Sequence, residues 1–527
     1  MQRLLTSLFI LCAALTAGAQ QIVDGINIDQ LRKVQYATAA ITQLYVDTIN
    51  QEKLAEEAIR GMLKSLDPHS AYSNAEETRR LNEPLDGNFE GIGVQYKMLE
   101  DTLVVMQTTP KGPSEKAGIL SGDRIVTVDG RSIAGVKITT DSIQHVLRGP
   151  KGTQVRLGIK REGVDGLLPF DIVRDKIPVN TVDAAYITAP GVGYIRLERF
   201  GAQSGKEVKA AIEQLKKAGM RQLILDLQQN GGGYLGAAQE VASEFLPEKS
   251  LVVFTEGRND ERKVLNAYSG GSFTKGDLVI LVDEFTASAA EIVSGAVQDH
   301  DRGTIIGRRT FGKGLVQRPI ELPDGSMIRL TVSHYFTPSG RCIQKPYTKG
   351  EKEEYALDFA NRYKHGELTN IDSIHLDSTK VYRTLRKERI VYGGGGIMPD
   401  IFVPLDTTTY TKFYTAISRH NILNQTSLRY NTKHREAIKQ QYADPEDFVS
   451  RYEVPEEVID GILSEAKAKG LAPKDDDELR ETVADLRFML KALVAYDVWD
   501  RAAYFRVFNQ RSDVFRAALE HLAAGKK

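Results

Sequence analysis

The sequence predicts a multidomain α/β protein with an inserted β-rich domain and helical N- and C-terminal regions. At 527 residues, the chain is too long for a single hydrophobic core and suits several domains. Residues 87–176 contain short strand patterns separated by turn signals, which predicts the β-rich domain. From residue 177 onward, strand and helix patterns alternate, and this alternation favours a mostly parallel sheet with right-handed crossovers.

The composition limits the partners that the protein is expected to have. Hydrophobic residues make up 41% and charged residues 26%, which is typical of a soluble globular protein. Lys and Arg total 69 against 70 for Asp and Glu, so nothing in the charge balance favours nucleic acid or an anionic membrane as a partner. The sequence has no HExxH motif and no cysteine pair, so we expect no metal and no other cofactor.

The first residues are typical of a signal peptide, at 1–19. Arg3 is followed by an apolar run at 4–15, which is too short to span a bilayer, and then by the small residues Ala17-Gly18-Ala19. We expect cleavage after Ala19, export across the inner membrane and a periplasmic location. An uncleaved anchor is disfavoured because no long hydrophobic segment follows.

The two cysteines indicate that the exported protein is stabilised without an internal disulfide. Cys12 lies inside the apolar run and lacks small residues just before it, which disfavours a lipoprotein. After cleavage only Cys342 remains, so the mature protein must be stable in an oxidising compartment through packing alone.

The N-terminal region, residues 20–86, is expected to form helices between about 28 and 65. These helices should end at Leu66-Asp67-Pro68-His69-Ser70, because a proline pushes the residue before it out of helical space. The elements expected in the β-rich domain, 87–176, are a strand after Gly91-Ile92-Gly93-Val94, strands at 101–106 and 124–128, a last strand at 154–160, a short helix and turn at 117–123, a helix at 141–147 and a turn at Asp129-Gly130.

The α/β core is expected at residues 177–405. Its features are strands at 192–197, 223–227, 251–254 and 278–282, a helix with the apolar stripe Val208, Ala211, Ile212 and Leu215, a hairpin turn at Pro323-Asp324-Gly325, and a segment at 399–404 that closes the core. Residues 345–392 are charged, hold no recognisable chemistry, and are interpreted as an insertion. The C-terminal helical domain, 406–527, carries an apolar stripe that is expected to be core rather than a cofactor site: Leu486, Met489, Leu490 and Leu493.

Ser288 stands at the start of the helix that follows the strand at 278–282. Ser288-Ala289-Ala290-Glu291 fits a capping box, in which Glu291 reaches back to the first amide, and such caps are common. A serine in this position also exposes its hydroxyl at the edge of the sheet. The amide of Ala289 and the helix dipole would then face a developing oxyanion, so the same geometry suits a nucleophile.

Lys313 is flanked by Gly312 and Gly314, and apolar residues adjoin them on both sides. It could be an ordinary solvated turn lysine, but glycines permit close backbone approach and apolar neighbours favour desolvation. To act as a base near pH 7, its pKa must fall by roughly 3, which is about 4 kcal/mol of differential solvation. Gln317 is either a plain strand residue or the group that holds the neutral amine in line with the serine hydroxyl.

Two glycine-rich segments are candidates for further parts of a site. The segment at 226–233 ends in three glycines at the carboxyl end of a predicted strand, where it forms either a tight turn or a source of oxyanion amides. The segment at 307–314 matches a phosphate-binding loop except that glycine replaces the final serine or threonine, so we reject phosphate binding. No GxSxG elbow is present, and nothing supports a triad with His300 or His334.

These motifs together resemble the carboxy-terminal processing proteases, a family of PDZ-containing serine endopeptidases. The matching segments come in the family's order and cover about residues 66–403. The resemblance implies a ClpP/crotonase-like protease core and a PDZ domain whose Gly91, Ile92, Gly93 and Val94 bind the substrate C-terminus by strand addition. One departure is Gln228, which stands where the family has an arginine.

The resemblance also implies the roles of the site residues. Ser288 would be the nucleophile, Lys313 the general base and Gln317 the residue that orients the lysine. The remaining implied roles are an oxyanion hole from the amides of Ala289 and of either Gly232 or Gly233, and support of the site by Glu291 and Thr310.

The expected function is therefore that of a serine endopeptidase that cleaves extracytoplasmic proteins near their C-termini. Its expected partners are protein or peptide substrates with free C-termini. The sequence leaves open whether the protein forms a homo-oligomer or binds an adaptor partner. The rival interpretation is a non-catalytic PDZ adaptor on a protease scaffold, against which the intact set of Ser288, Lys313 and Gln317 argues. A lipase or esterase would lack its usual nucleophile elbow.

Overall fold

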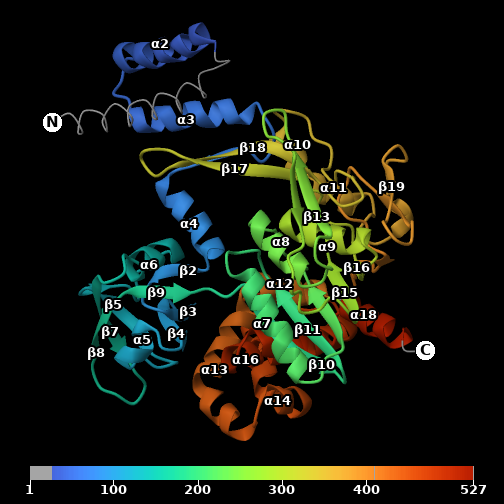
Figure 1. Ribbon diagram of the computed structural model, residues 1–527. Helices are drawn as coiled ribbons and strands as arrows, with labels where there is room; N and C mark the ends of the chain where they lie inside the picture. Colours follow the sequence, from blue (N-terminus) through green and yellow to red (C-terminus); the bar gives the residue numbers. More distant parts are fainter. Residues whose placement is uncertain (1–26, 409, 526–527) are drawn as a thin grey trace, which may run out of the picture.

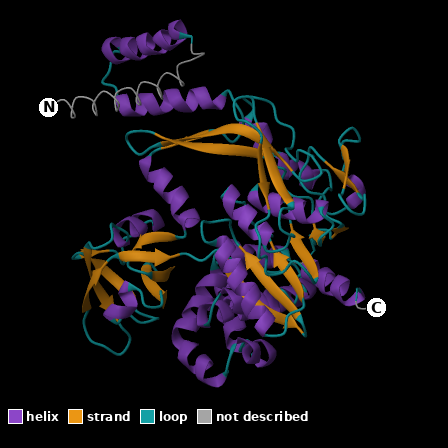
Figure 2. Cartoon of the chain, viewed as in Figure 1, coloured by secondary structure: helices purple, strands orange, loops and turns teal. Residues whose placement is uncertain are grey.

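The computed structural model describes residues 27–408 and 410–525. The predicted signal peptide at 1–19 and Cys12 lie outside the described residues. Figures 1 and 2 show four parts: a pair of N-terminal helices, a small strand-rich domain, a mixed core and a group of C-terminal helices. In the described ranges, no helix combines the length and apolar character needed to cross a membrane.

The N-terminal helices are α2 (Ile28–Leu44) and α3 (Gln51–Lys64), as the sequence predicts. Asn27 and Asn50 cap them by accepting backbone amides with their side chains. After α3 the chain forms the short strand β1 (Ala71–Ser73), which pairs with the core, and then α4 (Ala75–Asp86), which leads to the strand-rich domain.

The strand-rich domain is a sheet with the order β3-β4-β5-β7-β8, in which β6 also pairs with β5. Its strands are β3 (Val94–Leu99), β4 (Thr102–Thr108), β5 (Arg124–Val128), β6 (Arg131–Ser132), β7 (Gln154–Lys160) and β8 (Leu168–Val173). Helices α5 (Pro113–Ala117) and α6 (Thr140–Leu147) complete it, and β2 (Asn88–Gly91) pairs with β9 (Asp175–Pro178) where the chain enters and leaves. β3 is an edge strand.

Two details of this domain differ from the sequence prediction. The short helix expected at 117–123 is α5, which ends at Ala117 because Gly118 adopts the left-handed conformation, with φ 88°. The strand at 154–160 is not the last one, since β8 follows it. Pro169 obscured β8 in the sequence, yet an edge strand tolerates a proline because one side of it lacks a pairing partner.

The core sheet has the order β10-β11-β12-β15-β16-β21 and is parallel except for the antiparallel pair β10 and β11. Its strands are β10 (Val182–Ala189), β11 (Val192–Leu197), β12 (Gln222–Asp226), β15 (Asp277–Val282), β16 (Thr304–Gly307) and β21 (Ile401–Phe402). Helices α7 (Ser204–Lys217), α8 (Leu235–Ser243) and α9 (Ala289–Asp299) connect them. The predicted stripe on α7 is buried in the main hydrophobic cluster.

The strand predicted at 251–254 does not join this sheet, because β12 pairs directly with β15. It forms β13 (Leu251–Glu256) of a second, antiparallel sheet with the order β1-β18-β13-β14. The predicted hairpin is present in this sheet as β17 (Leu315–Glu321) and β18 (Met327–Phe336), and β14 (Lys263–Asn266) completes the sheet. A buried apolar run predicts a strand but does not say which sheet it joins.

The charged segment at 345–392 packs against the core rather than extending from it. It contains α10 (Lys352–Ala356), α11 (Asp358–Lys364), the 3-10 turn η1 (Ile371–Ser373), β19 (Val381–Arg383) and β20 (Ile390–Tyr392). Arg362 of α11 is buried and donates to the backbone carbonyls of Arg309 and Thr310, and Lys352 donates to the carbonyl of Ser70. The segment therefore supports the loops that precede Lys313.

The C-terminal region is helical, as predicted. It comprises α12 (Lys412–Arg419), α13 (Ile422–Gln441), α14 (Pro445–Arg451), α15 (Glu456–Ala468), α16 (Asp476–Val498), α17 (Arg501–Phe508) and α18 (Asp513–Ala524). Leu486 and Leu490 are buried in its own hydrophobic cluster and Met489 and Leu493 pack against it, which confirms that the stripe is core. Helix α18 instead joins a cluster under the main sheet, through Phe515 and Leu522 among others.

Candidate active site

Ser288 lies between the carboxyl end of β15 and the first residue of α9. Its backbone has φ 56° and ψ −116°, a strained conformation for a residue with a side chain. Its amide donates to Glu291 Oε2 at 2.8 Å, and its carbonyl accepts the hydroxyl of the buried Tyr335 at 3.1 Å. The amide and the carbonyl of Ser288 are thus both held, which fixes the position from which its side chain projects.

Glu291 connects the serine to the lysine. Its fully buried carboxylate accepts the Ser288 amide, the amides of Gly312 and Lys313 at 2.7 and 2.9 Å, and the Thr310 hydroxyl at 2.5 Å. Burial raises the pKa of Glu291 to about 7, against the opposing effect of these hydrogen bonds. The capping role expected for Glu291 is present at the Ser288 amide, and the same carboxylate positions the lysine loop.

This arrangement also explains why 307–314 is no phosphate-binding loop. The amides of Gly312 and Lys313, which would have to face a phosphate, donate to Glu291 instead. The loop therefore binds a carboxylate that the chain itself supplies, and the rejection of phosphate binding agrees with the structure.

Lys313 begins a chain of contacts that leads to the N-terminal region. Its Nζ donates to Gln317 Oε1 at 3.0 Å, and Gln317 Nε2 donates to the backbone carbonyl of His69. Burial lowers the pKa of Lys313, and the positive charge of Arg329 lowers it further. In the part of the chain that the structure describes, Lys313 Nζ makes no hydrogen bond to the Ser288 hydroxyl.

The predicted end of the N-terminal helices supplies the carbonyl that holds Gln317. Asp67 accepts the amides of His69 and Ser70 at 2.9 and 3.0 Å, and so fixes the loop. The His69 ring contacts the Tyr355 hydroxyl at 2.9 Å, and burial lowers the pKa of His69 to about 4, with the Lys313 charge acting in the same direction. The ring is therefore neutral near pH 7.

The glycine segment lies directly against the serine. A Cβ on Gly232, whose φ is 97°, would approach the Ser288 Cβ to 2.8 Å and the Ala289 amide nitrogen to 2.9 Å, so only glycine fits. The Gly232 amide donates to Asn230 Oδ1 at 2.8 Å. Among the described residues, no hydrogen bond uses the amides of Gly233 or Ala289, and both remain able to donate to a ligand.

These residues line one cavity of about 620 Å³. Of the predicted site residues, the cavity brings together Ser288, Ala289, Lys313, Gln317, Gly232 and Gly233. Glu291 and Thr310 lie behind it and are buried. Gly91, Ile92, Gly93 and Val94 do not line this cavity, because they belong to the strand-rich domain.

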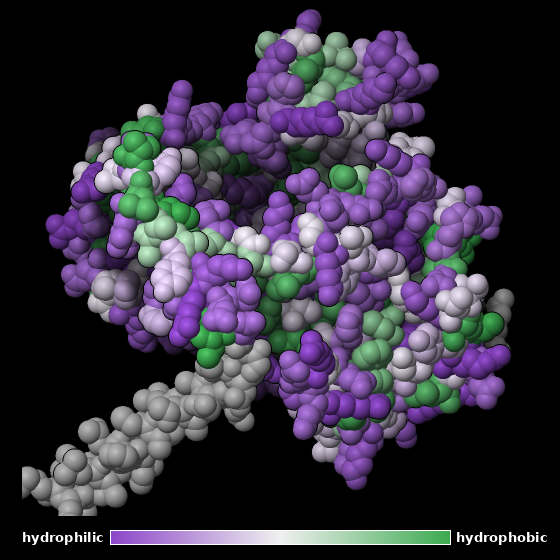
Figure 3. All heavy atoms as spheres, turned by 90° about the horizontal axis from the view of Figure 1, so that it is seen from above, coloured by the Kyte–Doolittle hydropathy of each residue, from purple (hydrophilic) through white to green (hydrophobic). Residues whose placement is uncertain are grey.

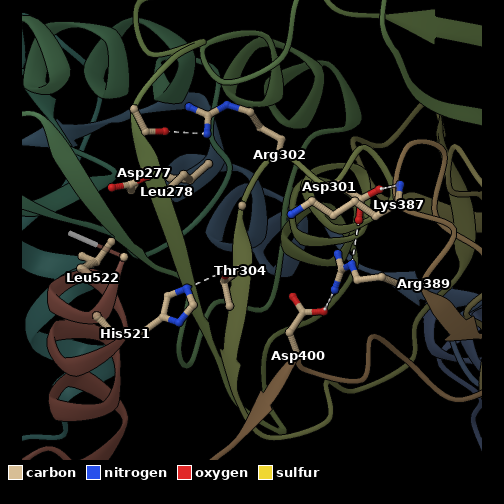
Figure 4. Close-up of a pocket in the computed structure, with 14 residues that line it drawn as sticks. Asp277, Leu278, Asp301, Arg302, Thr304, Lys387, Arg389, Asp400, His521 and Leu522 are labelled. Atoms are coloured by element: carbon tan, nitrogen blue, oxygen red, sulfur yellow. Dashed lines mark hydrogen bonds and ion pairs between the residues drawn. The ribbon is translucent and has the colours of Figure 1, made fainter. Parts of the chain in front are cut away.

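A second cavity lies at the ends of the core strands opposite to the ends near Ser288 (Figure 4). It is lined by Asp277 and Thr304, which begin β15 and β16, whereas Ser288 follows the carboxyl end of β15. Arg389 in its lining is paired with Asp301 and Asp400, and the His521 ring contacts the Thr304 hydroxyl.

Sequence reasoning missed several residues of the site. Tyr335 and Arg329 lie on β18, where their spacing resembles that of any half-buried strand.

Gln228, which stands where the family has an arginine, donates to Asp226 Oδ1. Arg196 donates to the other oxygen of Asp226 and to the Gln228 carbonyl. A guanidinium thus lies beside Asp226 even in the absence of an arginine at 228.

Comparison with family models matches four segments of the chain. Residues 191–351 match peptidase family S41, residues 91–169 match the PDZ domain, and residues 13–78 match the N-terminal domain of the activating protease CtpB. Residues 413–500 match a family of unknown function.

The matches to individual relatives cover most of the length of each relative. A carboxy-terminal-processing protease of Bartonella bacilliformis is 37% identical over 64% of this chain and 77% of the relative. The carboxy-terminal processing protease CtpB of Bacillus subtilis is 30% identical over 81% of this chain and 88% of the relative. The solved structure of a photosystem II D1 C-terminal processing protease is 27% identical, covers 72% of this chain and 94% of its own, and has a TM-score of 0.35. The chain belongs to the carboxy-terminal processing proteases of peptidase family S41, a family of serine-type peptidases, and carries a PDZ domain.

Proposed function

We propose that this protein is an endopeptidase that cleaves extracytoplasmic proteins near their C-termini with a Ser288–Lys313 dyad. The observation that carries the proposal is the shared carboxylate of Glu291, which holds the amides of both residues at one cavity. A carboxylate that binds both amides fixes the separation of the two main-chain segments from which the nucleophile and its base project. The lowered pKa of Lys313 supports the neutral amine that the dyad requires.

In the proposed reaction, the neutral amine of Lys313 donates one hydrogen to Gln317 and accepts the Ser288 proton with its lone pair. The lysine side chain has to bring Nζ to the hydroxyl for this step. The freed Oγ attacks the scissile carbonyl, and the oxyanion accepts from the amides of Ala289 and Gly233. The Lys313 ammonium then protonates the leaving amine, and water releases the acyl group by the same steps.

We assign the second oxyanion amide to Gly233 rather than Gly232. The Gly232 amide already donates to Asn230, whereas that of Gly233 has no acceptor among the described residues. Gly232 is instead the glycine that allows the segment to approach Ser288 closely.

The PDZ domain is proposed to capture the substrate C-terminus at Gly91-Ile92-Gly93-Val94. The amides of Ile92 and Gly93 make no hydrogen bond among the described residues, which suits them to a carboxylate. Strand β3, which begins at Val94, is an edge strand and can accept an added peptide strand. Amidation of the substrate terminus should therefore slow cleavage, and equal rates for free and amidated termini would remove the capture step.

The dyad is tested with Ser288→Ala and Lys313→Ala, each assayed by mass spectrometry on an unfolded substrate with a free apolar C-terminus. We expect both variants to lose at least about 1,000-fold in kcat/KM, because each removes a group needed for bond cleavage. Lys275→Ala, at an exposed lysine, is the matched control and should cut at the wild-type rate. Full activity of either dyad variant would exclude the assignment.

The extracytoplasmic location is proposed from the N-terminal sequence. N-terminal sequencing of the protein isolated from its native cells should give Gln20 as the first residue, from a periplasmic fraction. A mature chain that still begins at Met1 in the cytoplasmic fraction would contradict export.

A further inference from the structure

The C-terminal helical region meets the PDZ domain at strand β3. Gln425, in the first turns of α13, donates from Nε2 to the carbonyl oxygen of Met98 at 3.1 Å. On the neighbouring strand β4, Gln107 donates to the carbonyl of Trp499 at 2.7 Å. Figure 1 shows the PDZ domain and these helices as neighbours, although more than 300 residues separate the contacting segments along the chain.

The carbonyl of Met98 lies on the free edge of the PDZ sheet. Strands β3 and β4 are joined by a two-residue turn, Glu100 and Asp101, and Leu99 is opposite Thr102. The closing pair of such a hairpin is hydrogen-bonded, and backbone groups then alternate between the partner strand and the open side. The backbone N–H and C=O groups of Leu99 therefore point toward β4, and those of Met98 point to the open side of the sheet.

The register shift between Gln95 and Tyr96 leaves its unpaired residue, Met106, on β4. The alternation therefore continues along β3 and places the backbone groups of Tyr96 and Val94 on the open side. A peptide captured by its carboxylate near Ile92 and Gly93 would run antiparallel to β3. Its last residue would lie at Val94 and its third-last at Tyr96. The amide of its fifth-last residue would need the carbonyl of Met98, to which Gln425 already donates.

Two further contacts of α13, which follow Gln425 along the helix, anchor it at the PDZ domain. Leu428, one turn further along α13, is buried in a small hydrophobic cluster with Leu99, Val104 and Met106 of the PDZ domain. The buried carboxylate of Asp497 accepts Lys97 Nζ from the PDZ domain at 2.7 Å and Asn431 Nδ2 from α13 at 2.8 Å. Gln425 is thus carried by a helix that is fixed against β3.

We propose that Gln425 ends the strand that a substrate adds to the PDZ domain, so that the groove pairs only with the last few residues of the substrate. The C-terminal helical region would then be a specificity element, because it limits how much of the substrate main chain the PDZ domain reads. This inference rests on the proposed capture of C-termini. It assigns a role to α13, which lies in the segment that matches a family of unknown function.

The test uses the full chain with Ser288→Ala, so that peptides bind without being cut, and measures affinity by calorimetry. The probes are an apolar eight-residue peptide and two forms of it with an N-methyl group on the third-last or fifth-last amide. With Gln425 present, N-methylation of the third-last amide should weaken binding about tenfold, and that of the fifth-last should change it less than about twofold. Gln425→Ala should bind the unmodified peptide about fivefold more tightly, and methylation of the fifth-last amide should remove this gain.

The controls separate this inference from the capture of C-termini. Asn424→Ala changes the exposed neighbouring residue of α13 and should behave as the parent protein. If the fifth-last methyl group weakens binding equally with and without Gln425, the role of Gln425 is wrong. If the amidated peptide binds as well as the free acid, capture by the carboxylate itself fails, whatever the methylation results.

Discussion

At the scale of single residues, the site depends on groups that shift the protonation of their neighbours. Lys313 lies in a cavity that Arg329 also lines, and both burial and the Arg329 charge lower the pKa of the lysine. A second cation is an effective way to favour a neutral amine, because the two positive charges repel each other. Arg329 has this effect on the lysine without contacting the substrate.

We expect Arg329→Gln to shift the pH profile of kcat/KM. Removal of the positive charge raises the pKa of Lys313, so the limb on which activity rises with pH should move to higher pH by roughly 0.5. Arg318→Gln is the matched control, because Arg318 pairs with Asp260 at the protein surface, and its profile should not move. Identical profiles for Arg329→Gln and the wild type would show that Arg329 does not tune the lysine.

At the scale of elements, one buried carboxylate joins helix α9 to the loop before strand β17. Glu291 belongs to the first turn of α9, and its acceptor oxygens hold Gly312 and Lys313 of that loop. Every residue of α9 is buried, so the helix is a rigid support for the contact. The geometry of the site therefore follows from the packing of α9 as much as from Ser288 and Lys313 themselves.

Glu291→Gln should change how stability depends on pH. Burial raises the pKa of Glu291 from 4.5 to about 7, so the folded state binds its proton more tightly than the unfolded state. The resulting stabilisation is fully present below pH 4.5 and is lost as the pH rises through about 7. The difference in unfolding free energy between wild type and variant should change by about 3 kcal/mol over this range. Denaturant titrations at several pH values measure it, and a constant difference would contradict the raised pKa.

At the scale of the whole molecule, the C-terminal helices connect the PDZ domain to the protease core. Helix α13 contacts strand β3, while α18 packs under the core sheet and the carbonyl of Leu522 accepts Gln222 Nε2. Figure 3 shows apolar patches interspersed with a mostly hydrophilic surface on the face it presents. The position of the PDZ domain thus depends on a part of the chain far from both sites in sequence.

Leu428→Ala should loosen the PDZ domain without unfolding it. The change empties part of the cluster that Leu428 shares with Leu99, Val104 and Met106, at a cost of about 2–4 kcal/mol. Hydrogen exchange should become faster at the amides of β3 and β4 and stay unchanged in the core sheet. Asn424→Ala, on the exposed side of α13, should leave exchange as in the wild type, and equal protection in both variants would argue against the contact.

The sequence predicted much of the fold because local patterns encode local structure. The stripe on α7, the hairpin turn before β18 and the strand β7 follow from periodicity and turn chemistry, and the structure contains all three. The assignment of β13 to the core sheet was wrong, since strand pairing depends on contacts between distant segments. The segment at 345–392 offered no motif, although Tyr355 and Arg362 within it support the site.

The sequence by itself determined the chemical groups of the site, since serine, lysine and glycine at those positions are needed for the proposed reaction whatever surrounds them. Only the tertiary structure decided that Glu291 would hold both Ser288 and Lys313, and that the carbonyl of His69 would hold Gln317. It also decided that α13 would lie against β3. The physical reason is that burial and hydrogen bonding between segments far apart in the chain depend on how the domains pack, which no local pattern records.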